Sequence, residues 1–193
     1  MALMAAALLS SLGSALVLLG VTESAIASSY RRDMQMFYAV ESALARVYVE
    51  LDALPDWAVA TAGLMVSTLT DGDPGGTRAI GDAVVDLRAV TADLNASGAP
   101  LPWPPGRPSQ WHLFAWAPAD GLFGAMTTLP VYVAVWIHEL PDEGDPDVAG
   151  GRISAIRLHA RAYGASGARR QAEMTLVRHP GRPADPRSWH EVR

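Results

Sequence analysis

Residues 1–22, MALMAAALLSSLGSALVLLGVT, contain no charged side chain, and only Ser, Gly and one Thr interrupt the apolar residues. As an α-helix, this segment measures about 33 Å, close to the thickness of the hydrocarbon layer of a bilayer. The segment is therefore long and apolar enough to cross a membrane. The remaining residues have a composition typical of a soluble domain, so the chain is expected to hold one domain and an apolar extension.

The helical pattern continues beyond the uncharged segment. Apolar residues recur at steps of three or four, as on one face of a helix, at Ile26, Tyr30, Met34, Phe37, Val40, Leu44, Val47, Leu51 and Leu54. Neither Pro nor Gly occurs from Val21 to Leu54, and Pro55 disfavours helix at the residue before it. The sequence predicts one helix of about 50 residues, roughly 75 Å long. It should be apolar on all sides in residues 1–23 and on one side in residues 24–54.

Two interpretations of the first segment follow from the residues alone. A secretory signal peptide would end at a small-residue cleavage site, which Ala25-Ile26-Ala27 could supply, but the basic region that begins such peptides is missing. A transmembrane anchor is the other interpretation, and Gly13 and Gly20 would let a second helix approach closely.

Residues 55–179 are expected to form a globular α+β head. A helix is predicted over Asp82–Leu94, and strands are predicted at WHLFAWA (111–117), VYVAVWIHE (131–139), ISAIRLHARAYG (153–164) and ARRQAEMTLVR (168–178). The last two strands are joined through GASG, which favours a hairpin. A three- to four-stranded antiparallel sheet must cover its apolar face, and the helix over 24–54 is the strongest candidate for that cover. Residues 180–193 are expected to be disordered.

The run SALVLLGVTESAIASSYRRDMQMFYAVESALARV resembles the start of PilX-type minor pilins, members of the superfamily of type IV pilins and type II secretion pseudopilins. The resemblance rests on a Thr-Glu pair after the apolar segment, here Thr22-Glu23, and on an F-Y-A-x-E-x-x-L block. In this chain that block is formed by Phe37, Tyr38, Ala39, Glu41 and Leu44. The resemblance covers about 50 residues and is weaker beyond them.

The resemblance implies a pilin-like fold and a structural subunit of a type IV pilus or a type II secretion-like filament. Such a subunit is a single-pass inner-membrane protein with an extracytoplasmic head before assembly, and it reaches the cell surface or periplasm within a filament. Its partners would be other pilin-like subunits, bound through the N-terminal helix. Phe37, Tyr38 and Leu44 are expected to fix the head to the helix.

Composition disfavours other partners. The net charge is −5, and all 15 basic residues are arginines that form no broad cationic stretch, so a nucleic-acid partner is not expected. The chain has no cysteine, which excludes disulfides, thiolate metal sites and a cysteine nucleophile.

No catalytic motif is present, and the protein is not expected to be an enzyme. The five histidines are scattered without metal-binding spacing, and His159 is expected to be a surface residue. No catalytic residue and no organic cofactor are predicted. A divergent enzyme with an unrecognised site is the least favoured interpretation.

One loop carries a candidate metal site. In PDEGDPDVAGG, Pro141 to Gly151, the carboxylates suited to a hard cation such as calcium are Asp142, Glu143, Asp145 and Asp147. The loop loosely resembles the calcium loops of related pseudopilins, but it departs from the EF-hand spacing. The alternative interpretation is a solvated acidic loop that keeps the sheet soluble.

A second function from a different class also fits the sequence. The chain could be a monomeric, membrane-anchored extracytoplasmic binding protein. Its contact surface would then be the Pro- and Trp-rich stretch Pro100–Trp111.

Overall fold

A computed structural model describes residues 2–97, 110–123, 130–140, 155–179 and 182–192. The helices are α1 (Ala2–Asp52), α2 (Ala58–Thr61), α3 (Leu87–Ser97) and α4 (Asp120–Phe123). The strands are β1 (Thr77–Ile80), β2 (Ala83–Asp86), β3 (His112–Pro118), β4 (Val131–Glu139), β5 (Ala155–Gly164), β6 (Arg169–Val177) and β7 (Asp185–Val192), with a 3₁₀ turn at Ala165–Gly167. The α+β class predicted from the sequence is confirmed.

The first helix is uninterrupted, as the absence of internal Pro predicts. α1 is 51 residues long and ends three residues before Pro55. The chain divides into two compact units, residues 1–35 and residues 36–193, and each is described by itself. In the second unit, α1 contributes its C-terminal part to the globular head.

The main sheet has five antiparallel strands in the order β3-β4-β5-β6-β7. Each strand pairs with its sequence neighbour, so the sheet is a simple meander: Val135 lies opposite Ala160, and Ala160 lies opposite Ala172. The four strands predicted from the sequence correspond to β3, β4, β5 and β6, and β5 and β6 form the expected hairpin. β1 and β2 form a separate two-stranded sheet.

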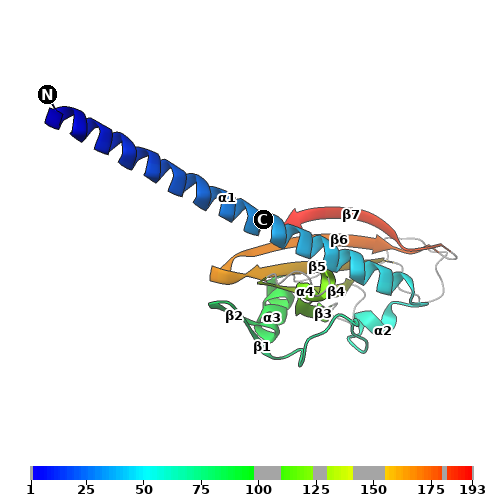
Figure 1. The fold of residues 1–193 in the computed structure, drawn as a ribbon. Helices are drawn as coiled ribbons and strands as arrows, with labels where there is room; N and C mark the ends of the chain where they lie inside the picture. The colour runs from blue at the N-terminus through cyan, green and yellow to red at the C-terminus, as the bar shows by residue number, and fades with distance from the viewer. Residues whose placement is uncertain (1, 98–109, 124–129, 141–154, 180–181, 193) are drawn as a thin grey trace. The chain divides into compact units, whose positions relative to one another are not determined.

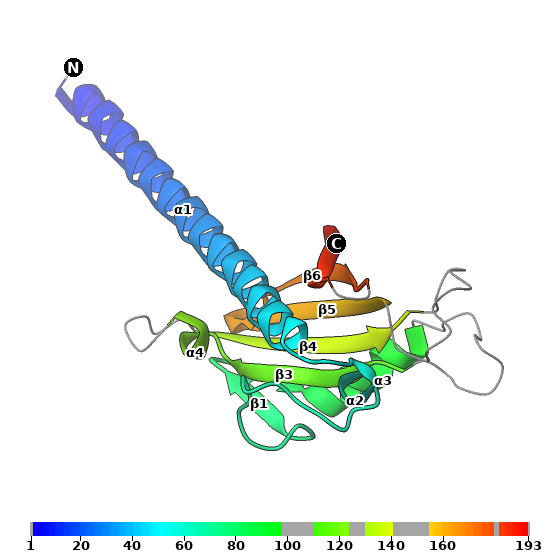
Figure 2. The ribbon, with the colours of Figure 1, turned by 90° about the vertical axis from the view of Figure 1, so that its right-hand side faces the viewer.

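Both faces of the main sheet carry a hydrophobic core. The C-terminal part of α1 covers one face, and its buried side chains are Met36, Ala39, Val40, Ala43, Leu44, Val47 and Leu51. The β1–β2 hairpin and α3 lie against the opposite face (Figures 1 and 2). There, Trp136 of β4 is fully buried, and its indole Nε1 donates a hydrogen bond to Thr91 Oγ1 of α3 at 2.8 Å. Because both faces of β4 are covered, eight of its nine residues are buried.

Three expectations need correction. The sheet has five strands instead of three or four, because Asp185–Val192 form β7 on the edge of β6. The tail expected to be disordered is therefore largely ordered by backbone pairing. The helix predicted over Asp82–Leu94 begins only at Leu87, since Gly81 has φ +61° and turns the chain into β2.

Candidate membrane and assembly segment

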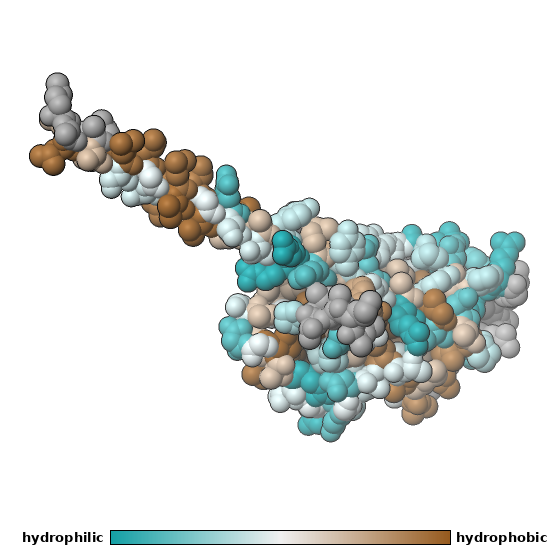
Figure 3. Space-filling model, viewed as in Figure 1, coloured by the Kyte–Doolittle hydropathy of each residue, from teal (hydrophilic) through white to brown (hydrophobic). Residues whose placement is uncertain are grey.

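The apolar part of α1 exposes its large side chains to an unusual degree. The residues concerned are Leu3, Met4, Leu9, Leu12, Leu16, Val17, Leu18, Leu19, Val21, Ile26 and Tyr30, and each exposes at least 56 % of its surface. Figure 3 shows hydrophobic residues over much of the visible surface of this part of the helix. This helix is long and apolar enough to cross a membrane. Such a surface is unfavourable in water, so the segment requires an apolar environment such as lipid or other helices.

Polar groups within this segment find partners in the helix itself. Ser14 Oγ donates to the carbonyl oxygen of Ser10 at 2.9 Å, and Thr22 Oγ1 donates to that of Leu18 at 2.9 Å. A hydroxyl that bonds the carbonyl four residues earlier needs no water, which removes most of the cost of placing it in hydrocarbon. A Cβ added at Gly13 or Gly20 would meet no atom within 4 Å, so no neighbour among the described residues requires glycine there.

The C-terminal end of α1 is capped by a residue that follows β6. Arg178 donates from Nη1 to the carbonyl oxygen of Leu54 at 2.5 Å and from Nη2 to that of Leu51 at 2.7 Å. Its guanidinium lies 4.3 Å from the ring centroid of Trp57, which is fully buried. A cation among the last carbonyls of a helix satisfies unpaired acceptors and opposes the negative end of the helix dipole.

Further contacts tie the same end of α1 to the chain before β7. The backbone N–H of Ala184 donates to Asp52 Oδ1 at 2.7 Å, and Tyr48 Oη donates to the carbonyl oxygen of Ala184 at 3.0 Å. Together with Arg178, these bonds connect α1 to both ends of the β6–β7 connection. The helix is thus fixed to the sheet by directional contacts as well as by its apolar face.

A third attachment lies at the β3 edge of the sheet. The segment Ser67–Thr70 runs parallel to β3, with the N–H of Ser67 donating to the carbonyl oxygen of Phe114 at 2.8 Å. Glu50 of α1 holds this segment by accepting from the backbone N–H of Thr68 at 3.3 Å and from its hydroxyl. Burial raises the pKa of Glu50, but hydrogen bonds from Ser67 and Thr68 outweigh it and leave the pKa below its usual value. The paired segment covers an edge that would otherwise be open to another strand.

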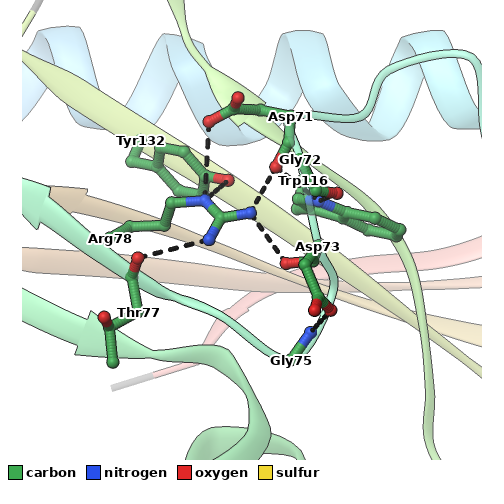
Figure 4. Close-up of polar contacts among 8 residues, drawn as sticks. All are labelled: Asp71, Gly72, Asp73, Gly75, Thr77, Arg78, Trp116 and Tyr132. Carbon is green, nitrogen blue, oxygen red and sulfur yellow. Dashed lines mark hydrogen bonds and ion pairs between the residues drawn. The ribbon is translucent and has the colours of Figure 1, made fainter.

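The loop after this segment is organised around Arg78 at the start of β1 (Figure 4). The guanidinium donates to the carbonyl oxygens of Asp71 and of Asp73, the latter at 2.8 Å, and Nε donates to Tyr132 Oη at 3.0 Å. Trp116 Nε1 also donates to the carbonyl oxygen of Asp71, at 2.9 Å. The positive charge among these oxygens is that of the Arg78 side chain. The hydrogen bonds that involve Tyr132 and Trp116 attach the loop to β4 and β3.

The residues expected to fix the head have different roles. Leu44 is fully buried, as predicted. Phe37 is half-buried and meets Trp189 of β7 in a T-shaped contact with ring centroids 5.8 Å apart. The expectation is wrong for Tyr38, which exposes 53 % of its surface and contacts the ring of Phe37 on the same helix.

The expectation that His159 lies on the surface is also wrong. This side chain is only 3 % exposed, because Trp111 and Trp136 lie against it. Arg161 Nε donates to His159 Nε2 at 2.9 Å, and His159 Nδ1 lies 3.0 Å from Glu173 Oε1. The hydrogen bond from His159, partly opposed by burial, holds the pKa of the Glu173 carboxyl below its usual value. Both imidazole nitrogens are occupied by neighbours within the protein.

The candidate calcium ligands Asp142, Glu143, Asp145 and Asp147 lie outside the described residues, as does most of the predicted contact stretch over 100–111. At the end of that stretch, Trp111 exchanges two hydrogen bonds with the Asn95 amide, at 2.7 and 3.2 Å. Within the part of the chain that the structure describes, no three acidic or histidine side chains converge in a way that could hold a metal.

Comparison with known proteins gives no relative: no family model, curated protein or solved structure matches this chain significantly.

Proposed function

We propose that this protein is a structural subunit of a pilin-like filament, a minor pilin or pseudopilin of a type IV pilus or a type II secretion-like system. Before assembly, α1 would hold it in the inner membrane by a single pass with the head outside the cytoplasm. In the filament, at the cell surface or in the periplasm, the same apolar segment would pack against the helices of other subunits. The work of such a protein is packing, and no substrate is turned over.

One observation carries the proposal. A single helix combines a bilayer-length segment whose large apolar side chains are exposed with a segment whose apolar face is buried on an antiparallel sheet. A simple anchor needs no continuous helix into the folded domain, since a flexible link would serve equally well. Continuity matters when the position of the head must be set by the packing of the segment, as in a helical assembly.

The contacts at the end of α1 support this interpretation. Arg178, Asp52 and Glu50 fasten the helix to β6, to the chain before β7 and to the β3 edge. A helix held at several points cannot rotate or slide on the sheet without breaking these bonds. The head would therefore be presented in one orientation relative to residues 36–52 of the helix.

The test separates packing from membrane insertion. Leu12→Ala, Leu16→Ala and Leu19→Ala combined keep the segment uncharged and helical but remove side-chain bulk that is at least 56 % exposed. We expect normal amounts of the variant in the membrane and a strong loss from purified filaments, measured by quantitative immunoblotting. Val84→Ala on β2, where the side chain is 71 % exposed, is the matched control and should enter filaments normally.

Two results would contradict the proposal. Mapping of the mature N-terminus to Ser28 would show cleavage after Ala27, which removes the apolar segment. Purification of the native chain as a monomer, with no other pilin-like chain in crosslinked membranes or sheared filaments, would instead favour the membrane-anchored binding protein.

A further inference from the structure

Two adjacent arginines, at positions 31 and 32, follow the apolar segment. Arg31 and Arg32 are both exposed, and neither side chain pairs with another residue in the described parts of the chain. No acidic residue lies three or four positions from either arginine, the spacings at which helix side chains meet. Arg46, further along the same helix, is by contrast paired with Glu50 at 3.1 Å.

The position of this pair relative to the apolar segment can be measured along the helix. From Thr22 to Arg31 the helix rises by about 14 Å. The head-group layer extends roughly 5 to 8 Å beyond the hydrocarbon on each side of a bilayer. The Cα–Cβ bonds of a helix tilt toward its N-terminus, which is the direction of the apolar segment, so long side chains at positions 31 and 32 can reach back toward the head-group layer.

The residues between Thr22 and Arg31 suit the head-group layer. Residues 24–29, SAIASS, are small or weakly polar apart from Ile26, and Tyr30 exposes 68 % of its surface. Tyrosine is enriched at membrane interfaces because its ring is apolar and its hydroxyl is polar. Arginine is the side chain best suited to phosphate, since its planar guanidinium donates two parallel hydrogen bonds.

We propose that Arg31 and Arg32, assisted by Tyr30, bind the phosphate groups of anionic lipids and set the depth of α1 in the membrane. This inference rests on the membrane-inserted stage of the proposed function, and it names the partner of the helix at that stage. The two positive charges complement the net negative charge of a phosphatidylglycerol surface. The pair would act on the leaflet that faces the head.

Because the chain has no cysteine, one introduced thiol can report the depth without further changes. The full-length protein with Ser24→Cys carries a nitroxide label and is reconstituted in vesicles of phosphatidylglycerol or of phosphatidylcholine. Depth is read from collisions of the label with oxygen and with a water-soluble nickel complex. We expect the label to lie deeper in phosphatidylglycerol by about 3 to 5 Å, which is two to three residues of helix rise. Salt at 0.5 M, by screening the charges, should reduce the difference.

Matched variants assign the shift to the arginine pair. The double substitution R31Q/R32Q should abolish the difference between the two lipids, whereas R31K/R32K should keep most of it. R46Q changes an arginine already paired within the head and should leave the difference intact. Equal depths of the native chain in both lipids, or a lipid-dependent shift that persists in R31Q/R32Q, would overturn the proposal. The vesicles contain no other subunit, so this outcome is independent of whether the protein enters filaments.

Discussion

Removal of the Arg178 side chain tests how α1 is joined to the sheet. In Arg178→Ala, the carbonyl oxygens of Leu51 and Leu54 lose two short charge-assisted hydrogen bonds, at 2.7 and 2.5 Å. Such bonds contribute about 1.5 kcal/mol each at the lower end of their range. The contact with Trp57 adds about 1 kcal/mol. The third bond, to Asp52 at 3.3 Å, is long and is not counted.

These contributions sum to about 4 kcal/mol, from which partial replacement by water must be subtracted because Arg178 is only half-buried. We expect a loss of about 3 kcal/mol in the free energy of unfolding of the head. This corresponds to a factor of about 10² in the unfolding equilibrium. For a chain of this size it also corresponds to a decrease of about 9 °C in Tm.

The assay is urea and thermal unfolding of the full chain in detergent, followed by tryptophan fluorescence and near-ultraviolet circular dichroism. Arg187→Ala is the control, because the Arg187 side chain is 56 % exposed and pairs with Asp185 on the surface. Its loss should cost less than about 1 kcal/mol. Arg178→Lys keeps the charge but not the paired donors, and should fall between the two. A decrease in the free energy of unfolding below about 1 kcal/mol in Arg178→Ala, or equal decreases in both alanine variants, would refute the stabilising role of Arg178 at the end of α1.

Two further predictions concern the head. Burial lowers the pKa of His138 to about 4. In the unfolded chain the pKa of this histidine is near 6.5, so as the pH falls the unfolded state takes up the proton before the folded state does. Up to about 3 kcal/mol of the free energy of unfolding should therefore be lost between pH 6.5 and 4. Urea unfolding at a series of pH values should show this loss, and the free energy of unfolding of His138→Gln should depend less steeply on pH. The same pH dependence in the native chain and in His138→Gln would contradict the prediction. Gly81 has φ +61°, and an added Cβ would lie 3.1 Å from the Cβ of Ala165, so Gly81→Ala should cost about 2 kcal/mol. Gly167→Ala, with φ +72° and no neighbour within 4 Å, isolates the backbone cost and should lose about half as much by the same assay.

The sequence alone determined the elements whose residues form a regular local pattern. The length of α1 followed from its apolar spacing and from the absence of Pro and Gly between Val21 and Leu54. Strands β3, β4, β5 and β6 followed from β-branched runs and alternation. The sheet-covering role of α1 followed because an apolar sheet face needs an apolar partner, and α1 offers the longest such face.

Strand β7 was decided by the tertiary structure. Its sequence, DPRSWHEV, contains Pro and four ionisable side chains and shows no apolar alternation. It becomes a strand because β6 offers an unpaired edge and the preceding residues are bound to α1. Edge pairing of this kind satisfies backbone groups whatever the side chains are, so the local sequence carries little signal for it.

The candidate site likewise has one part that the sequence determines and one part that the fold decides. An apolar, bilayer-length segment is visible in the sequence, because hydropathy is a sum over neighbouring residues. The cap on α1 is not, since Arg178 lies 124 positions after Leu54 and nothing in the local pattern distinguishes it from other arginines. The burial of His159 likewise depends on Trp111 and Trp136, which reach it from other parts of the chain. Contacts between distant residues depend on how the strands are placed beside one another, and only the folded chain fixes that placement.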